Sequence, residues 1–223
     1  MIHPLFLNRR DAGRQLAKLL QRYAHARDPL VLGLPRGGVP VAFEVARALN
    51  ATLDIFMVRK LGVPGHEELA MGAIATGDVI VWNEDVLAEM RVPREHIDAT
   101  IERERAELAR REQAYRGDRP PPRVEGRTVI LVDDGLATGA SMRAAARALR
   151  AQHPGEVVIA VPVAAAETCH DLRREADIIV CAAKPDPFYA VGLWYRDFSA
   201  TTDDEVAELL AESQAAPGGG VAR

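Results

Sequence analysis

Short apolar runs alternate along the chain with segments whose apolar residues recur at helical spacing. The runs predict buried strands at residues 30–34, 53–58, 128–133, 157–163 and 178–182. The periodic segments predict helices at residues 9–26, from near Pro40 to Leu49, and at 141–152, 165–175 and 203–212. Strands that alternate with helices predict a doubly wound, mostly parallel α/β sheet, in which ligands bind at the carboxyl ends of the strands.

Two apolar runs in the middle of the chain depart from this alternation. They lie at residues 73–76 and 79–82 on either side of Gly77-Asp78. Two such runs around a two-residue turn predict a hairpin.

A long charged segment follows the hairpin and predicts a helix over residues 83–115. Its apolar stripe, at Ile97, Ile101, Leu108 and Tyr115, is thin and heptad-like, which suits a helix that lies on the domain or pairs in a homodimer. Its charges are of mixed sign, so a solvated helix is favoured over a surface that binds nucleic acid. A linker rich in proline and glycine ends the segment.

The composition narrows the function classes. The 223 residues carry a net charge of −4, which argues against a nucleic-acid partner. No apolar run approaches the roughly 18–20 residues that span a bilayer, and no signal peptide is visible. The two cysteines, Cys169 and Cys181, form neither a disulfide framework nor a zinc site. We expect a reduced, cytoplasmic protein with no membrane association.

The strongest chemical pattern is an acidic pair that follows an aliphatic strand. Asp133 and Asp134 come directly after it, and their carboxylates can accept hydrogen bonds from a sugar diol or hold Mg²⁺. The small-residue loop 135–141 then opens into a helix, whose N-terminus and backbone N–H groups favour an anion. Thr138 and Ser141 add hydroxyl groups. The alternative is an ordinary strand-ending turn with a helix cap.

Residues 129–141 resemble the phosphoribosyl pyrophosphate motif of the type I phosphoribosyltransferases. The resemblance implies that Asp133 and Asp134 contact the ribose hydroxyls and that Mg²⁺ takes part. It also implies a 5-phosphate site lined by Gly135, Leu136, Ala137, Thr138, Gly139 and Ser141.

Two weaker segments support the resemblance. Residues 34–39 are similar to the family's pyrophosphate loop, in which Gly37 and Gly38 would present N–H groups and Arg36 would add charge-assisted bonds. Arg59 and Lys60 follow the next predicted strand, where similar proteins place basic residues near pyrophosphate. The alternative for residues 34–39 is a tight turn with a surface arginine. The alternative for Arg59 and Lys60 is a solvated basic pair.

The resemblance also implies a domain plan. It gives a core at residues 27–183 with a helical insertion at about 83–117, a small hood from residues 1–26 and 184–212, and a disordered tail at 213–223. Family members carry a flexible loop that closes over the site, which by position is about 61–72. His66 within it is a candidate acid or base, although an exposed histidine without a role is the simpler interpretation.

Residues 184–192 resemble the hood of the purine-salvage members. Tyr189 would stack on the base and Lys184 would donate to a ring oxygen; alternatively, these aromatic residues fill a small core. Ala137 departs from the purine-salvage pattern, which often has an acidic residue there.

The resemblance implies a Mg²⁺-dependent phosphoribosyltransferase acting on phosphoribosyl pyrophosphate and a nucleobase. Arg36 and Lys60 would neutralise the departing pyrophosphate. The first alternative is a regulator that binds phosphoribosyl pyrophosphate without turnover. A sugar-phosphate hydrolase is the second, and the missing nucleophile elbow and histidine clusters count against it.

Overall fold

A five-stranded parallel sheet forms the centre of the molecule. A computed structural model of the chain describes residues 3–215, and the strand order is β2-β1-β6-β7-β8, with every neighbouring pair parallel. The strands are β1 (Leu30–Gly33), β2 (Thr52–Ile55), β6 (Thr128–Val132), β7 (Glu156–Val163) and β8 (Ile178–Ala183). The predicted doubly wound α/β sheet is therefore confirmed.

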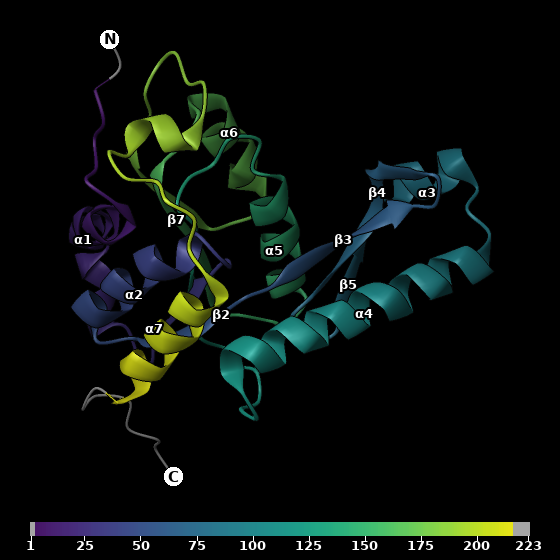
Figure 1. Cartoon of the computed structure of the whole chain (residues 1–223), viewed down its shortest axis with the longest axis horizontal. Coiled ribbons are helices and arrows are strands. Elements are labelled where there is room, and N and C mark those ends of the chain that lie inside the picture. The colour runs from purple at the N-terminus through teal and green to yellow at the C-terminus, as the bar shows by residue number, and fades with distance from the viewer. Residues whose placement is uncertain (1–2, 216–223) are drawn as a thin grey trace.

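Helices cover both faces of this sheet (Figure 1). On one face lie α1 (Arg9–Leu19), α2 (Gly38–Leu49) and α7 (Asp203–Ala215), and on the other α5 (Ala140–Arg150) and α6 (Ala166–Asp171). Short 3-10 turns occur at η1 (Gln21–His25), η2 (Leu172–Arg174) and η3 (Val191–Trp194).

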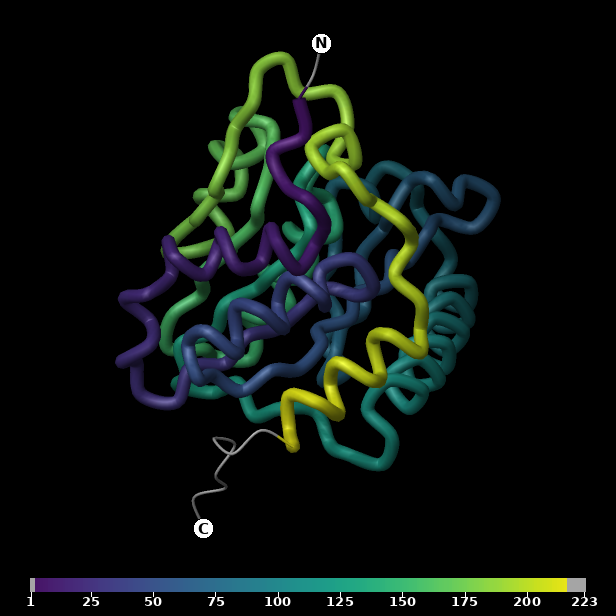
Figure 2. The backbone as a smooth tube through the Cα atoms, turned by 60° about the vertical axis from the view of Figure 1, so that its left-hand side comes forward, coloured from purple at the N-terminus to yellow at the C-terminus, as the bar shows by residue number. Residues whose placement is uncertain are grey.

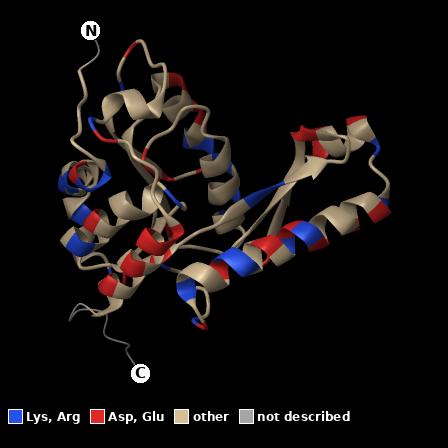
Figure 3. Cartoon of the chain, in the orientation of Figure 1, with Lys and Arg blue, Asp and Glu red and all other residues tan. Residues whose placement is uncertain are grey.

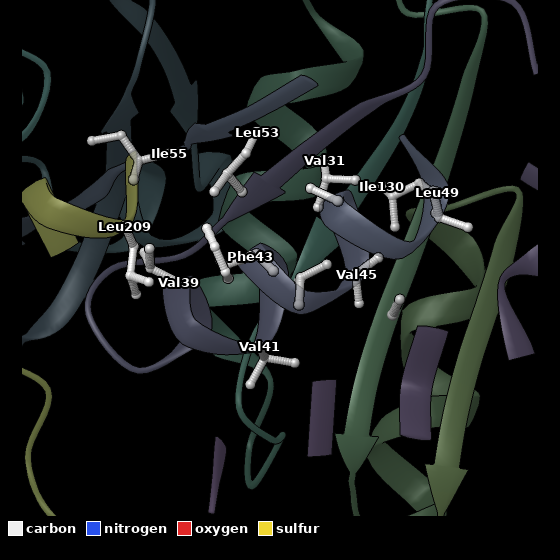
Figure 4. Close-up of a cluster of buried hydrophobic side chains, with 14 of the residues drawn as sticks. Val31, Val39, Val41, Phe43, Val45, Leu49, Leu53, Ile55, Ile130 and Leu209 are labelled. Carbon is white, nitrogen blue, oxygen red and sulfur yellow. The ribbon is translucent and has the colours of Figure 1, made fainter. Parts of the chain in front are cut away.

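Alternation along the strands explains the two apolar cores. Val31 and Ile130 join the cluster under α2 and α7, where Phe43 and Leu209 also lie (Figure 4), whereas Leu32 packs on the opposite face. Successive strand side chains point to opposite faces, so a strand covered on both sides is apolar throughout.

A second, antiparallel sheet projects from the parallel one together with two helices (Figure 1). Its strands are β3 (Val58–Val63), β4 (His66–Ala75) and β5 (Val79–Trp82), and its helices are α3 (Glu84–Met90) and α4 (Arg94–Arg116). The predicted β4–β5 hairpin is confirmed, with Ala75 opposite Val79.

The single helix predicted over residues 83–115 is two helices. Arg91 adopts the left-handed conformation at the end of α3, with a φ of 46°, and Pro93 stands at the N-cap of α4. A proline cannot donate the backbone hydrogen bond that a continuous helix requires. Arginine and glutamate alternate along α4, as expected for a solvated helix (Figure 3).

Two expectations in the region before α3 are wrong. The predicted strand 53–58 is divided, since β2 ends at Ile55 and β3 begins at Val58 and pairs antiparallel with β4. Residues 61–72, expected as a loop, form most of the β3–β4 hairpin. The physical reason is burial: Leu61 and Met71 pack in a cluster under α3 and α4 that short-range patterns do not reveal.

The N-terminal segment lies beside residues 194–197 (Figure 2). The backbone N–H of Leu5 donates to the carbonyl of Trp194 at 2.9 Å, and that of Arg196 donates to the carbonyl of Phe6 at 2.8 Å. Phe6 packs there with Trp194 and Tyr195.

The C-terminal helix, α7, does not join the N-terminal segment. It packs against α2, α4 and β2. Residues 213–215 of the expected tail belong to this helix, and the remainder lies outside the described residues. Within residues 3–215, no helix has the length and apolar character needed to cross a membrane.

Candidate active site

The loops that follow β1 and β6 meet at the carboxyl edge of the sheet. The chain turns from β1 toward β2 on one side and from β6 toward β7 on the other, so these two loops diverge from a switch point. The N–H of Leu34 donates to the carbonyl of Val132 at 2.9 Å and holds the two strand ends together. Crevices at such switch points are the usual ligand sites of open α/β sheets.

Gly37 and Gly38 lie in contact with the acidic pair. A β-carbon at Gly38 would come within 2.7 Å of the carbonyl of Val132 and 2.9 Å of Cα of Asp133. One at Gly37 would overlap a carboxylate oxygen of Asp134. Only glycine allows this approach, so the structure brings these predicted residues together. The peptide between Pro35 and Arg36 is cis.

Three hydrogen bonds hold the acidic pair, and a fourth holds the arginine beside it. The N–H of Asp134 donates to Oδ1 of Asp133 at 2.8 Å. Arg9, in the first turn of α1, donates from Nε to Oδ2 of Asp134 at 2.8 Å and from Nη1 to the carbonyl of Ser199 at 2.6 Å. The hydroxyl of Tyr195 donates to the backbone carbonyl of Asp134 at 2.5 Å. Arg9 of α1 and Tyr195 of the hood thus fix the position of Asp134.

Burial governs the electrostatics of the pair. It raises the pKa of Asp133 well above its ordinary value, and the neighbouring charge of Asp134 raises it further. Burial also raises the pKa of Asp134, while the hydrogen bond and charge of Arg9 lower it. Burial likewise raises the pKa of Tyr195, which keeps its hydroxyl a donor.

The loop that follows the pair has a buried side and an exposed side. Gly135 and Leu136 are buried, and the hydroxyl of Thr168 donates to the carbonyl of Ala137 at 2.6 Å. Gly139, with a φ of 69°, caps α5 in the left-handed conformation that glycine tolerates. Four residues of the loop are exposed, namely Ala137, Thr138, Ala140 and Ser141. Their position suits an anion bound at the N-terminus of α5.

A cavity of about 150 Å³ joins both loops to α4. Among the predicted site residues, Arg36, Arg59 and Ser141 line it. Lys60 is not among its lining residues; it is exposed on β3, where side chains of successive residues point to opposite faces. Arg59 and Lys60 thus lie inside an antiparallel strand, not at the end of a parallel one, and only Arg59 reaches the cavity.

The two residues predicted to bind a base lie on the loop after β8. Lys184 is exposed, and 68% of the surface of Tyr189 is accessible. The neighbouring Phe188 instead packs on Trp194, with ring centroids 6.5 Å apart. The core interpretation therefore holds for Phe188 and does not hold for Tyr189, which is exposed.

His66, which the sequence predicts as a candidate acid or base, is exposed at the start of β4.

Sequence reasoning missed Arg9, Tyr195 and Arg111. Arg9 lies 125 positions from Asp134 and has no local motif. Arg111 lies on a helix with many other charges, and only its place beside the cavity distinguishes it. The position of Arg9 in the segment predicted to form the hood was the one available signal for a contact between the chain end and the site.

Comparison with known families agrees with this geometry. The family described as "Phosphoribosyl transferase domain" matches residues 7–188, which include both loops and the acidic pair. The chain belongs to this family.

Individual relatives agree with the assignment. "Putative phosphoribosyl transferase Rv0571c" of Mycobacterium tuberculosis is 46% identical over 206 residues, which are 92% of this chain and 46% of that protein. The chain therefore spans about half the length of the curated relatives it matches first. "Bifunctional protein PyrR" of Brevibacillus brevis is 31% identical over 110 residues, or 47% of this chain and 60% of that protein.

A solved structure is also similar to this chain over most of its length. The protein TT1426 from Thermus thermophilus is 43% identical and has a TM-score of 0.82. The match covers 93% of this chain and 98% of that one.

Proposed function

We propose that this chain binds phosphoribosyl pyrophosphate with Mg²⁺ and transfers its phosphoribosyl group to a nucleobase, releasing pyrophosphate. In this reaction the bond between C1 of the ribose and the pyrophosphate oxygen breaks, a bond between C1 and a ring nitrogen forms, and the nitrogen loses a proton. The contact between Gly37-Gly38 and Asp133-Asp134 is the observation that carries the proposal. An acceptor pair for a diol lies there beside the glycine loop. The N–H of Gly38 donates to the carbonyl of Leu34 at 3.0 Å, so the expectation that it faces the ligand is wrong, and the N–H of Gly37 is the proposed donor to the diphosphate.

The residues around this contact have distinct tasks. The carboxylates of Asp133 and Asp134 accept hydrogen bonds from the ribose hydroxyls. The loop at 135–141 and the N-terminus of α5 bind the 5-phosphate, with Thr138 and Ser141 as hydroxyl donors. Arg36 and the N–H of Gly37 stabilise the negative charge that develops on the pyrophosphate.

Mg²⁺ fits the donor set of the acidic pair. Asp133 uses Oδ1, and Asp134 uses Oδ2, for the hydrogen bonds described above, so each carboxylate has a second oxygen for an ion. The described part of the chain has no group of three metal-ligating side chains, so phosphate oxygens and waters would complete the shell. When bound, the ion would neutralise charge on the diphosphate.

The acceptor site is proposed on the loop after β8. Tyr189 offers an exposed ring that can stack on a base, and Lys184 can donate to a ring oxygen. Ala137 stands where purine-salvage members often have an acidic residue, so a group other than residue 137 would take the proton from the base. A cytoplasmic location and a homodimer remain predictions.

A turnover assay tests the proposal. The protein is incubated with phosphoribosyl pyrophosphate, Mg²⁺ and a panel of bases, and pyrophosphate release is measured. Release with one base supports the transferase and names its acceptor. Tight binding of phosphoribosyl pyrophosphate without release favours the regulatory alternative.

A second assay tests the donor site alone. Calorimetry compares the unmodified protein with the double variant Asp133→Asn, Asp134→Asn. Equal affinity for phosphoribosyl pyrophosphate in both would contradict the proposed site.

A further inference from the structure

Three arginines from three separate elements line the cavity beside the glycine loop. Arg36 comes from that loop, Arg59 from β3 and Arg111 from α4, and Ser141 faces the same cavity from the start of α5. The cavity thus continues from both proposed phosphate loops to a helix that has no place in the predicted site.

Carboxylates already engage these arginines, but to different degrees. Arg59 donates to Glu104 at 2.6 Å, and 26% of its side chain is exposed. Arg36 lies 3.8 Å from Asp203, with half of its side chain exposed. Arg111 donates from Nε to Glu107 at 2.7 Å and keeps 45% of its side chain exposed. A guanidinium has five N–H donors, so Arg36 and Arg111 retain donors for an anion.

Arg111 shares its carboxylate partner with a second arginine. Glu107 accepts hydrogen bonds from both Arg110 and Arg111, so two cations share one carboxylate. These bonds lower the pKa of Glu107 to about 2, and it is fully ionised at neutral pH. One carboxylate cannot use all the donors of two guanidinium groups, so Arg111 keeps donors for a ligand.

The C-terminal half of α4 is held firmly at the cavity. Arg116, which is buried, donates to Asp54 of β2 at 2.9 Å. The hydroxyl of Tyr115 donates to Asp203 at 2.5 Å, and Glu112 accepts from Thr76 at 2.6 Å. Arg111 is presented by an anchored helix, so less ordering is needed when it binds a ligand.

We propose that Arg111 and Arg36, which line this cavity from α4 and from the glycine loop, bind the diphosphate group of the substrate together. Arg59, which is held by Glu104, contributes to the wall of the cavity. The inference rests on the proposed function and assigns part of its diphosphate recognition to α4. Two guanidinium groups suit a diphosphate because each can donate two parallel hydrogen bonds to phosphate oxygens.

Pyrophosphate binding by the full chain, measured by calorimetry with Mg²⁺, tests the inference without an acceptor or turnover. Arg111→Gln is expected to weaken binding about tenfold or more, because it removes a charge-assisted contact. Arg111→Lys keeps the charge but loses the paired donors, and an intermediate affinity is expected. Arg110→Gln is the matched control, since Arg110 also binds Glu107 but does not line the cavity. Its affinity is expected to stay within about twofold of the unmodified protein.

The outcomes separate the two proposals. Equal pyrophosphate affinity in the unmodified protein and Arg111→Gln overturns the role of Arg111 and leaves the transferase proposal standing. Arg111-dependent binding of pyrophosphate, with no binding of phosphoribosyl pyrophosphate, supports the cavity and contradicts the transferase proposal. Thermal unfolding of each variant checks that the exposed substitution leaves the fold intact.

Discussion

Arg9 and Asp134 form an ion pair that joins the first helix to the end of the central strand. The distance from Nε of Arg9 to Oδ2 of Asp134 is 2.8 Å, and their side chains are only 12% and 15% exposed. The guanidinium also lies over the ring of Phe198, with its Cζ 3.9 Å from the ring centroid. One arginine therefore ties the acidic pair to the C-terminal segment of the hood.

Arg9→Gln is expected to destabilise the protein by about 2–4 kcal/mol, because it leaves a largely buried carboxylate without its cation. Chemical denaturation gives the free energy of unfolding. Arg10→Gln is the control: Arg10 lies 3.5 Å from the buried Glu44, which keeps its ion pair with Arg47 at 2.6 Å, so a loss below about 1 kcal/mol is expected. Similar losses in both variants would argue against a special role for the Arg9–Asp134 pair.

Gly38→Ala is expected to abolish detectable binding of phosphoribosyl pyrophosphate while the protein still folds. The added methyl group meets the backbone at Val132 and Asp133, so the loop must move away from the acidic pair. Calorimetry measures the affinity, and circular dichroism checks the fold. Gly126→Ala is the control, because nothing lies within 4 Å of its added β-carbon. Its positive φ costs about 1–2 kcal/mol of stability, and its ligand affinity should be unchanged.

Asp133→Asn is expected to stabilise the ligand-free protein at neutral pH. The pKa of Asp133 is raised in the folded state, so the folded protein holds a proton at pH values where the unfolded chain has lost it. The free energy of unfolding therefore falls as the pH rises from about 4 through the raised pKa. Asparagine keeps an oxygen for the N–H of Asp134 and carries no charge.

Thermal unfolding across pH measures this effect. The gain in midpoint temperature over the unmodified protein should be present at pH 7 and should vanish near pH 4. Asp118→Asn, at an exposed position in the linker after α4, provides the control and should show no comparable gain. A gain that is larger at acidic than at neutral pH would contradict the assigned direction.

The sequence predicts best what depends on neighbouring residues. The strand that ends at Val132 is apolar from Val129 onward because both faces are buried there, and the acidic pair follows it directly. The break between Ile55 and Val58, where the chain passes from one sheet to the other, could not be predicted because no glycine or proline marks it. Phe56 and Met57 there are buried, so the segment has the pattern of one apolar run.

Long-range contacts account for the missed site residues. Arg9, Tyr195 and Arg111 reach the site from the first helix, the hood and α4, and each is set by the packing of whole elements. The mixed charges of α4 predict a solvated helix, and this prediction is correct for most of its surface. The charge pattern does not show that the turn carrying Arg111 faces a cavity.

Asp203→Asn is expected to strengthen pyrophosphate binding about two- to fivefold. The Asp203 carboxylate lies 3.8 Å from Nη1 of Arg36 and competes with the ligand for it, and exposed pairs of this kind contribute up to about 1 kcal/mol. Calorimetry with Mg²⁺ and pyrophosphate measures the change. The matched control is Asp204→Asn, the next residue in the first turn of α7. It tests for a general effect of lost negative charge on this turn and should leave the affinity nearly constant.

The variant Asp203→Asn can also be followed by the ultraviolet absorbance of Tyr115. Burial and the hydrogen bond to Asp203 raise the pKa of Tyr115 to about 12, burial being the larger cause. Removing the carboxylate should lower this pKa, although burial keeps it above 10, and ultraviolet titration of tyrosinate detects the change. The variant Tyr115→Phe lacks this hydroxyl, so its titration shows which part of the tyrosinate signal comes from Tyr115. If Asp203→Asn lowers the pKa of Tyr115 but leaves pyrophosphate affinity unchanged, Asp203 contacts the helix as described while Arg36 does not bind the diphosphate.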